Sequence, residues 1–259
     1  KVTNFNEDAV GCYEEAIRIR SQCKSTTKLN NALIFTKSAK ALQDQQNYDK
    51  SIECYSYSLR VYLTHFGKDS LDVADTLTGM GKSFAMKSVF EKTMQCYDKA
   101  MRVYEYREGL APKEKKGLLH REIADALQRL DGDIFEVLEH YRSSVSFLEE
   151  FNERHSMAAP VSEKSAEELN KRLLTYYSEM LAILRRVLRI ERDKKIKDEL
   201  CDEIGDVLHR MGNLYATFGQ YDEAMSCFSE VLQNQRKTNS DELRIADLLF
   251  NMGNIYLEQ

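Results

Sequence analysis

The segment Leu208–Leu232 reads LHRMGNLYATFGQYDEAMSCFSEVL and contains two helical patterns on either side of a glycine. In the first half, Tyr215 follows Gly212 by three residues. After the second glycine, Gly219, apolar residues recur at helical spacing: Ala224, Phe228, Val231. This arrangement predicts two amphipathic helices joined by a tight turn.

A cysteine followed by an aromatic residue marks the second helix of this unit, and the same pair recurs along the chain. It occurs at Cys12, Cys54, Cys96 and Cys227. The first three cysteines are 42 residues apart, and the last follows after 131 residues, close to three further steps of about 44. Such a period is typical of arrays in which each supersecondary unit stacks on its neighbours.

Small residues occupy one register in the first helices of the repeats. They are Ala39, Gly81, Ala124, Gly212 and Gly253. A glycine inside a helix costs about 1 kcal/mol relative to alanine. Its use therefore indicates that a neighbouring helix approaches closely at this point. A larger side chain would overpack the contact and destabilise the fold by about 1–3 kcal/mol.

Three features of this unit resemble tetratricopeptide repeats. They are a first helix with a small residue followed by an aromatic one, the Gly219–Tyr221 turn, and a second helix with the spacing Ala-x3-Phe. The run FGKDSLDVADTLTGMGKSF, residues 66–84, resembles the long repeats of kinesin light chains and related scaffold proteins. The resemblance is strongest at 29–104 and 205–259 and weak at 152–204. It implies a right-handed α-solenoid without catalytic residues, and peptide or protein partners.

The sequence thus predicts an all-α fold in which residues 1–259 form a single solenoid of about five to six repeats. No glycine or proline marks a turn between Lys164 and Arg192, so one long helix is expected there. Pro112 and Pro160 predict exposed connections near 106–117 and 152–163. Because the chain begins in a second helix and ends in a first helix, we expect further repeats or partners beyond both ends.

Composition excludes several other classes of protein. The net charge of −5 argues against a nucleic-acid partner, which usually needs a basic face. No apolar run approaches the ~18 residues of a membrane span, so no membrane insertion is expected. Two prolines and 11 glycines are too few for the frequent turns of a β-sandwich or barrel. The first residue is Lys1, so a targeting segment would not be visible.

The sequence contains no complete motif for catalysis or metal binding. The run GMGKS, residues 79–83, ends like a phosphate-binding loop, but Thr76 stands where that motif needs a glycine. The five histidines are widely spaced, and neither a Cys-x2-Cys pair nor a His pair at i,i+4 occurs. No serine lies in a nucleophile-elbow pattern. We therefore expect no enzyme activity, no cofactor and no metal site.

The repeated cysteines are expected to be free thiols. Equivalent positions on neighbouring helices lie about 8–10 Å apart or more, whereas a disulfide needs Cα atoms within about 7 Å. A disulfide that involves Cys23 or Cys201 stays an open alternative. Reduced, packed thiols favour a reducing compartment, so a cytoplasmic location is expected.

The resemblance places the first helices along a concave groove, and their polar residues are the candidate peptide-binding residues. These are Lys37, Lys40, Lys82, Arg121, Arg210, Asn213, Asn251 and Asn254. Lysine and arginine suit carboxylates on a ligand. The asparagines lie at equivalent positions or at i,i+3, and a carboxamide can bond to the backbone of an extended peptide. His209 stands where the chaperone-tail-binding version of the fold needs a lysine, which argues against that version.

Three functions are consistent with these features. The first is a non-catalytic scaffold that binds a peptide or protein segment in the groove. The second is a structural subunit packed permanently in a larger complex. The third is a helical enzyme or regulator whose catalytic part lies outside residues 1–259.

Overall fold

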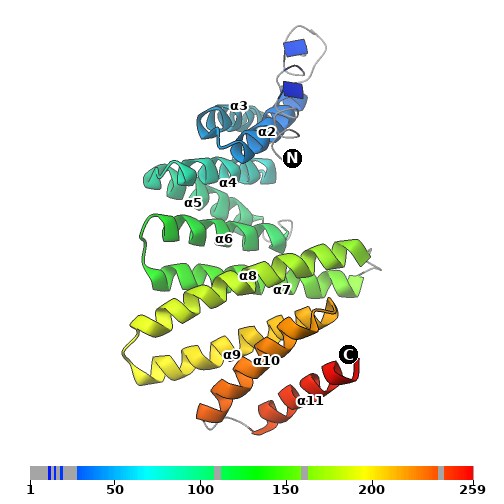
Figure 1. Cartoon of the computed structure of the whole chain (residues 1–259). Coiled ribbons are helices and arrows are strands. Elements are labelled where there is room, and N and C mark those ends of the chain that lie inside the picture. Colours follow the sequence, from blue (N-terminus) through cyan, green and yellow to red (C-terminus); the bar gives the residue numbers. More distant parts are fainter. Residues whose placement is uncertain are drawn as a thin grey trace. The chain divides into compact units, whose positions relative to one another are not determined.

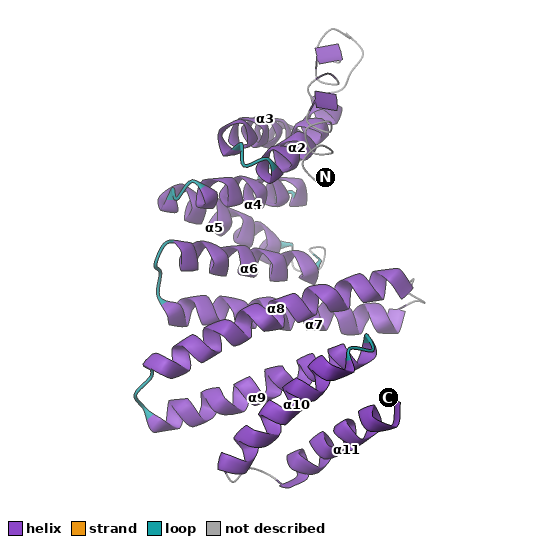
Figure 2. Cartoon of the chain, viewed as in Figure 1, coloured by secondary structure: helices purple, strands orange, loops and turns teal. Residues whose placement is uncertain are grey.

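A computed structural model of the chain describes residues 11–12, 15, 18–19, 28–107, 112–158, 163–238 and 242–258. Throughout these residues the structure consists of α-helices joined by short turns, and it has no strand (Figure 2). The predicted all-α fold is confirmed. None of the described helices combines the length and the apolar character needed to cross a membrane.

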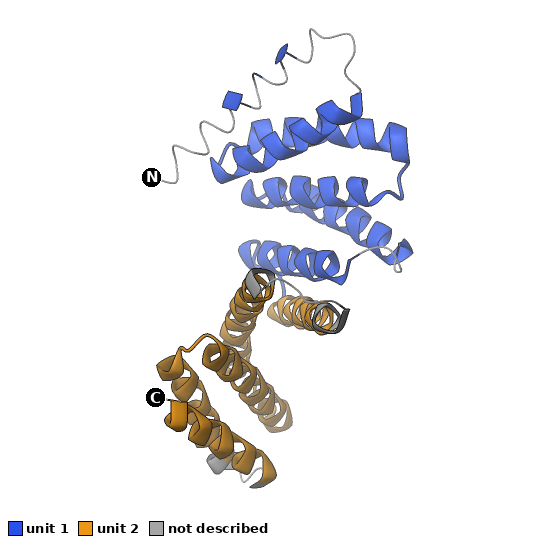
Figure 3. Cartoon of the chain, turned by 90° about the vertical axis from the view of Figure 1, so that its right-hand side faces the viewer, with its two compact units in different colours: residues 1–133 blue, residues 134–259 orange. Residues whose placement is uncertain are grey.

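The chain divides into two compact units, unit 1 from Lys1 to Asp133 and unit 2 from Ile134 to Gln259 (Figure 3). The described helices of unit 1 are α2 (Lys28–Asp44), α3 (Tyr48–Phe66), α4 (Leu71–Met86), α5 (Phe90–Tyr106) and α6 (Lys113–Arg129) (Figure 1). Those of unit 2 are α7 (Ile134–Ala158), α8 (Glu163–Ile190), α9 (Lys194–Thr217), α10 (Tyr221–Thr238) and α11 (Glu242–Glu258). A single solenoid over the whole chain stays a prediction.

Successive helices pack as hairpins within each unit. In unit 1, α2 packs against α3 and α4, and α4 packs against α5 and α6. The first helices of the hairpins, α2, α4 and α6, therefore lie next to one another. In unit 2, α8 packs against α7 and α9, and α9 packs against both α10 and α11.

The turns of the α2–α3, α4–α5 and α9–α10 hairpins each contain a left-handed residue two positions before the aromatic that opens the second helix. This residue is Gly219 in unit 2, with φ of 68°. In unit 1 it is Gln46 and Ser88, with φ of 61° and 57°. Asn47 then caps α3, because its side chain accepts a bond from the backbone N–H of Lys50. The two turns of unit 1 therefore adopt the same left-handed backbone geometry without a glycine.

Glycines in the first helices are in contact with aromatic rings. A Cβ atom at Gly81 would lie 2.5 Å from Tyr97 Cε1, and one at Gly212 would lie 2.5 Å from Phe228 Cε1. Both distances are far shorter than any real contact of a Cβ atom. The close approach predicted at Gly81 and Gly212 is confirmed, and the rings of Tyr97 and Phe228 are almost fully buried.

The same prediction stays open for Gly253. No atom of the described chain lies within 4 Å of a Cβ atom at this position, and Gly253 is exposed. The reason is that no described helix follows α11 to place an aromatic ring there. Tyr256 and Leu257 on α11 are likewise exposed, at 66% and 87%.

The long helix predicted between Lys164 and Arg192 is confirmed as α8, which spans Glu163–Ile190. Its expected core residues Tyr177, Met180, Leu184 and Val187 are buried, whereas Ile190 at its end is 54% exposed.

The predicted connections are shorter than expected, because helices extend into them. Pro112 directly precedes α6, where a proline is tolerated because the first helical N–H groups need no partner in the helix. Residues 113–117 are consequently helical, and Lys116 and Gly117 are buried. Similarly, α7 continues to Ala158. Pro160 lies outside the described residues.

The cysteines that share one register are free thiols with different exposure. Cys96 is buried, Cys54 and Cys227 are half-buried, and Cys12 is exposed. Burial raises the pKa of the Cys96 and Cys227 thiols, which keeps them in the unreactive protonated form. Cys23 lies outside the described residues.

Two alanine substitutions in α9 test the glycine–aromatic contact. Gly212→Ala should destabilise unit 2 by about 1–2 kcal/mol, because overpacking against Phe228 outweighs the gain in helix propensity. Gly205→Ala is the matched control: its Cβ atom would lie 3.9 Å from Val231 Cγ1, so it should stabilise by up to about 1 kcal/mol. Urea unfolding measures both. Equal stabilisation by the two variants would contradict the contact.

Candidate functional site

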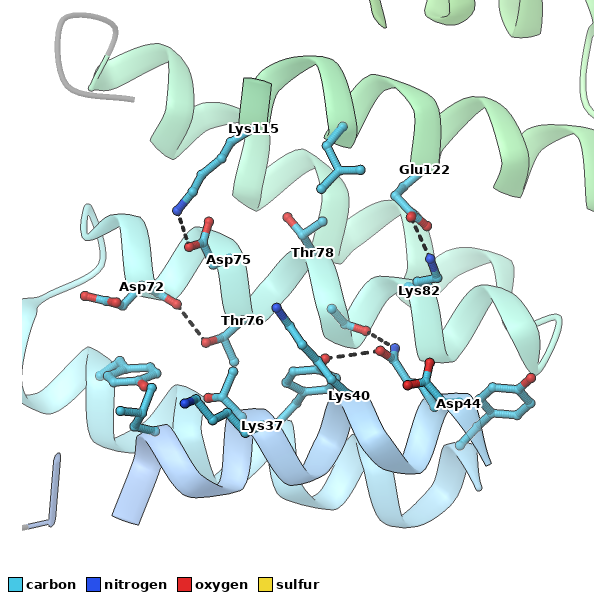
Figure 4. A pocket seen from close by; sticks show the side chains of 18 of the residues that line it. Lys37, Lys40, Asp44, Asp72, Asp75, Thr76, Thr78, Lys82, Lys115 and Glu122 are labelled. Atoms are coloured by element: carbon cyan, nitrogen blue, oxygen red, sulfur yellow. Dashed lines mark hydrogen bonds and ion pairs between the residues drawn. The ribbon is translucent and has the colours of Figure 1, made fainter. Parts of the chain in front are cut away.

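A groove of about 670 Å³ runs along the first helices of unit 1 (Figure 4). Its walls come mainly from α2, α4 and α6, and tyrosines of α3 and α5 contribute to its floor. The polar and charged residues that line it on the three first helices are Thr36, Lys37, Lys40, Gln43, Asp44, Asp72, Asp75, Thr76, Thr78, Lys82, Lys115 and Glu122.

Three of the basic residues predicted to bind peptides lie in this groove. They are Lys37 and Lys40 on α2 and Lys82 on α4. A fourth, Arg121 on α6, does not line it; its guanidinium lies 3.8 Å from the Asp125 carboxylate one turn along the same helix. The first-helix register therefore places Lys37, Lys40 and Lys82 on the groove wall, but not Arg121.

Lys82 is engaged by a carboxylate from the next first helix. Its Nζ lies 2.7 Å from Oε1 of Glu122, which joins α4 to α6 across the groove. The Glu122 side chain is only 9% exposed, whereas that of Lys82 is 48% exposed. A carboxylate with so little access to water depends on this partner, because an uncompensated buried charge is strongly unfavourable.

A second link between α4 and α6 is formed by Asp75. Its carboxylate pairs with Lys115 and also accepts a hydrogen bond of 2.6 Å from the hydroxyl of Tyr104 on α5. Burial, and next to it the charge of Asp75, raises the pKa of Tyr104, so the hydroxyl stays protonated and donates. Two of the four groove lysines, Lys82 and Lys115, are thus already neutralised by the protein.

Lys37 and Lys40 differ from those two lysines. Both are exposed, and neither has an ion pair or hydrogen bond with any described residue. They stand at i,i+3 on α2, so their side chains leave the same face of the helix, toward the groove (Figure 4). The α2 wall therefore presents two available cations, whereas Lys82 and Lys115 on the facing helices are each paired with a carboxylate.

The floor of the groove is a hydrogen-bonded network around Gln43. Its amide nitrogen donates to the carbonyl oxygen of Gly79 at 2.8 Å and to Ser83 Oγ at 2.7 Å. Its amide oxygen accepts from the hydroxyl of Tyr55 at 3.2 Å. These bonds fix α2, α3 and α4 to one another beneath the lysines. Burial raises the pKa of Tyr55, as do the charges of Asp44 and Glu122.

The remaining predicted residues lie in unit 2, on α9 and α11. Asn251 Nδ2 lies 3.0 Å from Nε2 of His209 and 3.4 Å from Oδ1 of Asn213, so these amides bond to each other and to the imidazole. Asn254 is exposed and has no hydrogen bond among the described residues. Arg210 pairs with Glu149 on α7. The structure thus brings Asn213 and Asn251 together and leaves Asn254 apart.

Several groove residues were missed by reasoning from single helices, above all Gln43, Lys115 and Glu122. A signal for them exists in the sequence. Glu122 follows Lys82 by 40 residues, and Lys115 follows Asp75 by 40 residues, which is close to one repeat. Opposite charges one repeat apart on successive first helices therefore indicate ion pairs across the groove.

The chemistry of the groove follows from the charged groups on its walls. No group of three or more His, Cys, Asp or Glu side chains that could hold a metal ion occurs within the described ranges. The carboxylates of the groove walls that pair with lysines tie helices together. What the arrangement offers to a ligand is charge, hydrogen-bond donors and exposed apolar surface.

Comparison with known proteins agrees with this architecture. Residues 205–238, which include most of α9 and all of α10, match the family model of the tetratricopeptide repeat. The crystal structure of BtubC (BKLC) from P. vanneervenii is similar, with a TM-score of 0.50, 12% sequence identity and coverage of 92% of this chain and 76% of that one. This likeness shows a shared fold.

Two further solved structures align over most of the chain. A putative kinesin light chain with nearly identical TPR-like repeats from Podosopora anserina has a TM-score of 0.44 and 12% identity, and covers 83% of this chain and 99% of that one. The TPR2AB-domain:pHSP90-complex of yeast Sti1 has a TM-score of 0.37 and 14% identity, with coverage of 86% and 99%. No curated protein matches the chain in sequence. The chain is a helical-repeat protein that contains a tetratricopeptide repeat.

His209 makes the stability of unit 2 depend on pH. Burial lowers its pKa from 6.5, so the folded state binds the proton less readily than the unfolded state. The stability is therefore full above pH 6.5 and falls as the pH decreases through the depressed pKa. Urea unfolding at pH 7.5 and 5.5 should show a smaller loss for His209→Gln than for the native chain. An equal loss of stability in the variant and the native chain would contradict this role of His209. Burial also lowers the pKa of His140, so part of the loss should persist in the variant.

Proposed function

We propose that the chain is a non-catalytic scaffold that holds an extended segment of a partner protein in the groove of unit 1. The observation that carries this proposal is the pair Lys37 and Lys40, which project into the groove and have no partner among the described residues. Carboxylates on the bound segment would pair with these ammonium groups.

The apolar lining of the groove supports the same proposal. Leu33 on α2, Met86 at the end of α4 and Leu118 on α6 line the groove and are 50%, 37% and 42% exposed. Covering such surface contributes about 25 cal/mol for each Å² that is removed from water. A segment with both acidic and apolar side chains would therefore contact the lysines and the apolar residues of the groove together.

Polar groups in unit 2 form a separate candidate contact surface. Asn254 is exposed and without a hydrogen bond within the described chain, so its amide can bond to the backbone of an extended segment. Asn213 and Asn251 already share a bond of 3.4 Å, and each keeps further donors or acceptors for a ligand. Arg210, which pairs with Glu149, would contribute less.

Site-specific crosslinking tests the groove in the native protein. A photo-reactive residue at Leu118 should crosslink to one contiguous segment of a partner, and the same residue at Lys99, on the outer helix α5, should not. A synthetic peptide with the crosslinked sequence should then bind the purified chain. Crosslinks of equal yield at both positions, or a peptide that does not bind, would refute the groove as the site.

Charge reversal tests the role of α2 in holding that peptide. The double variant Lys37→Glu/Lys40→Glu should weaken binding about tenfold or more, because two attractive contacts become repulsive. The control Lys68→Glu/Lys99→Glu makes the same change in net charge outside the groove and should bind almost normally. Fluorescence anisotropy measures the dissociation constants, and circular dichroism verifies that both variants fold. Equal affinities for the two variants would discard this assignment.

Salt concentration separates the scaffold from the alternative of a permanent structural subunit. Contacts between exposed charges weaken as salt screens them, so partner binding should decrease between about 0.1 and 1 M salt. A partner that stays associated through purification at high salt would favour the structural subunit.

A further inference from the structure

A small pocket of unit 2 lies between α9, α10 and α11, and residues of these three helices alone line it. Its volume is about 200 Å³. At about 30 Å³ for each water molecule, several waters fit inside, so one long side chain could enter by displacing them. The residues that line the pocket indicate which kind of side chain this would be.

Comparison of the two units shows how the sequence produces this pocket. Asp75 on α4 and Asp206 on α9 stand at equivalent positions, six residues before the close-packed glycine of their helix. The residue 29 positions after Asp75 is Tyr104, whose ring is buried and whose hydroxyl donates to the Asp75 carboxylate at 2.6 Å. The residue 29 positions after Asp206 is Gln235, which is shorter and has no ring. The position that holds a buried ring in unit 1 therefore borders a pocket in unit 2.

The charged groups around the pocket leave one negative charge in excess. Asp206 lies 3.5 Å from Arg244 of α11, and both side chains are more than half exposed, so this ion pair is a weak one. Asp247, one turn further along α11, also lines the pocket. It is exposed and has no ion pair or hydrogen bond with any described residue. The pocket thus presents one carboxylate that the protein does not neutralise.

The floor of the pocket is apolar. Val231 and Leu248 line it and are 2% and 1% exposed. Lysine and arginine have long methylene stems that pack on apolar surface while their charged ends reach a polar partner. A ligand carboxylate or phosphate would meet the excess negative charge of the walls and is disfavoured. The combination of an apolar floor with an available carboxylate at the wall therefore suits a basic side chain.

We propose that this pocket binds one basic side chain, arginine or lysine, of a protein segment. The stem of that side chain packs on Val231 and Leu248. Its cationic end pairs with Asp247 and donates a hydrogen bond to the carboxamide oxygen of Gln235. This site goes beyond the proposed function, because the groove of unit 1 selects acidic side chains and the pocket of unit 2 selects basic ones.

Peptide titration of the purified chain tests this site. The probe is a short alanine peptide with blocked ends and one central arginine. Its matched control carries citrulline, which has nearly the same shape without the positive charge. The arginine peptide should shift the NMR signal of the His209 imidazole, which lines the pocket, until the site is saturated. The citrulline peptide should bind about fivefold more weakly or less, because it cannot form the ion pair.

Three variants locate the binding site. Asp247→Asn should weaken binding of the arginine peptide about fivefold or more, because it removes the unpaired carboxylate. Asp198→Asn removes the same charge from an exposed position of α9 outside the pocket and should bind almost normally. Gln235→Tyr introduces the side chain that unit 1 has at this position, so it should fill the pocket and abolish binding. Circular dichroism verifies that each variant folds.

Equal affinities of the arginine and citrulline peptides would overturn the proposal, and so would unchanged binding by Asp247→Asn. If Gln235→Tyr does not fold, the comparison of Asp247→Asn with Asp198→Asn still decides. No residue of unit 1 lines the pocket, so these results are independent of the crosslinking and charge-reversal experiments. The two proposals can therefore fail separately.

Discussion

The contact between a helical glycine and an aromatic ring is the constraint on which the rest of the structure depends. At Gly81 and Gly212 the ring of the following helix occupies the place that a Cβ atom would need. Gly79 meets the ring of Tyr55 in the same way, across the junction between two hairpins. Helices that meet at glycine can approach more closely than helices that meet through larger side chains. The contact therefore fixes α4 relative to α3 and α5, and α9 relative to α10.

This regular packing determines which polar residues meet. Because α2, α4 and α6 lie next to one another in similar registers, residues about one repeat apart face each other across the groove. Lys82 reaches Glu122, and Lys115 reaches Asp75. The bond between Asn251 and His209 shows the same relation in unit 2, over 42 residues. The spacing that arises from apolar packing thus determines which polar residues of successive first helices meet.

Much of the fold could be predicted from the sequence, and the reason is physical. Glycine, aromatic and turn positions recur at a fixed step, and each has a local meaning that tertiary context does not reverse. The single helix α8 was predictable because nothing between Glu163 and Ile190 breaks a helix. The groove lysines of α2 and α4 followed from the same register. The surroundings of Gly253 did not, because the sequence pattern describes a position and not whether a neighbouring helix is present.

The ion pairing of each charged residue could not be predicted from the pattern of a single helix. Lys40 and Lys82 are equivalent in sequence terms, both basic and both on the inner side of a first helix. Their difference depends on the residue one repeat later: Glu122 follows Lys82 by 40 residues, whereas no acidic partner reaches Lys40. Single-helix patterns cannot contain this information, since it belongs to a pair of helices.

The charged groups of the groove therefore differ in how far the protein already pairs them. Asp75 is held by two donors from two helices, and Glu122 is held by one donor in a nearly dry environment. Lys37 and Lys40 are held by no described residue and are exposed. An acidic segment can pair with the lysines of α2 without breaking an existing ion pair. Pairing with Lys82 costs more free energy, because the nearly buried carboxylate of Glu122 then loses its donor. Binding of an acidic segment should therefore begin on α2 and extend toward α6.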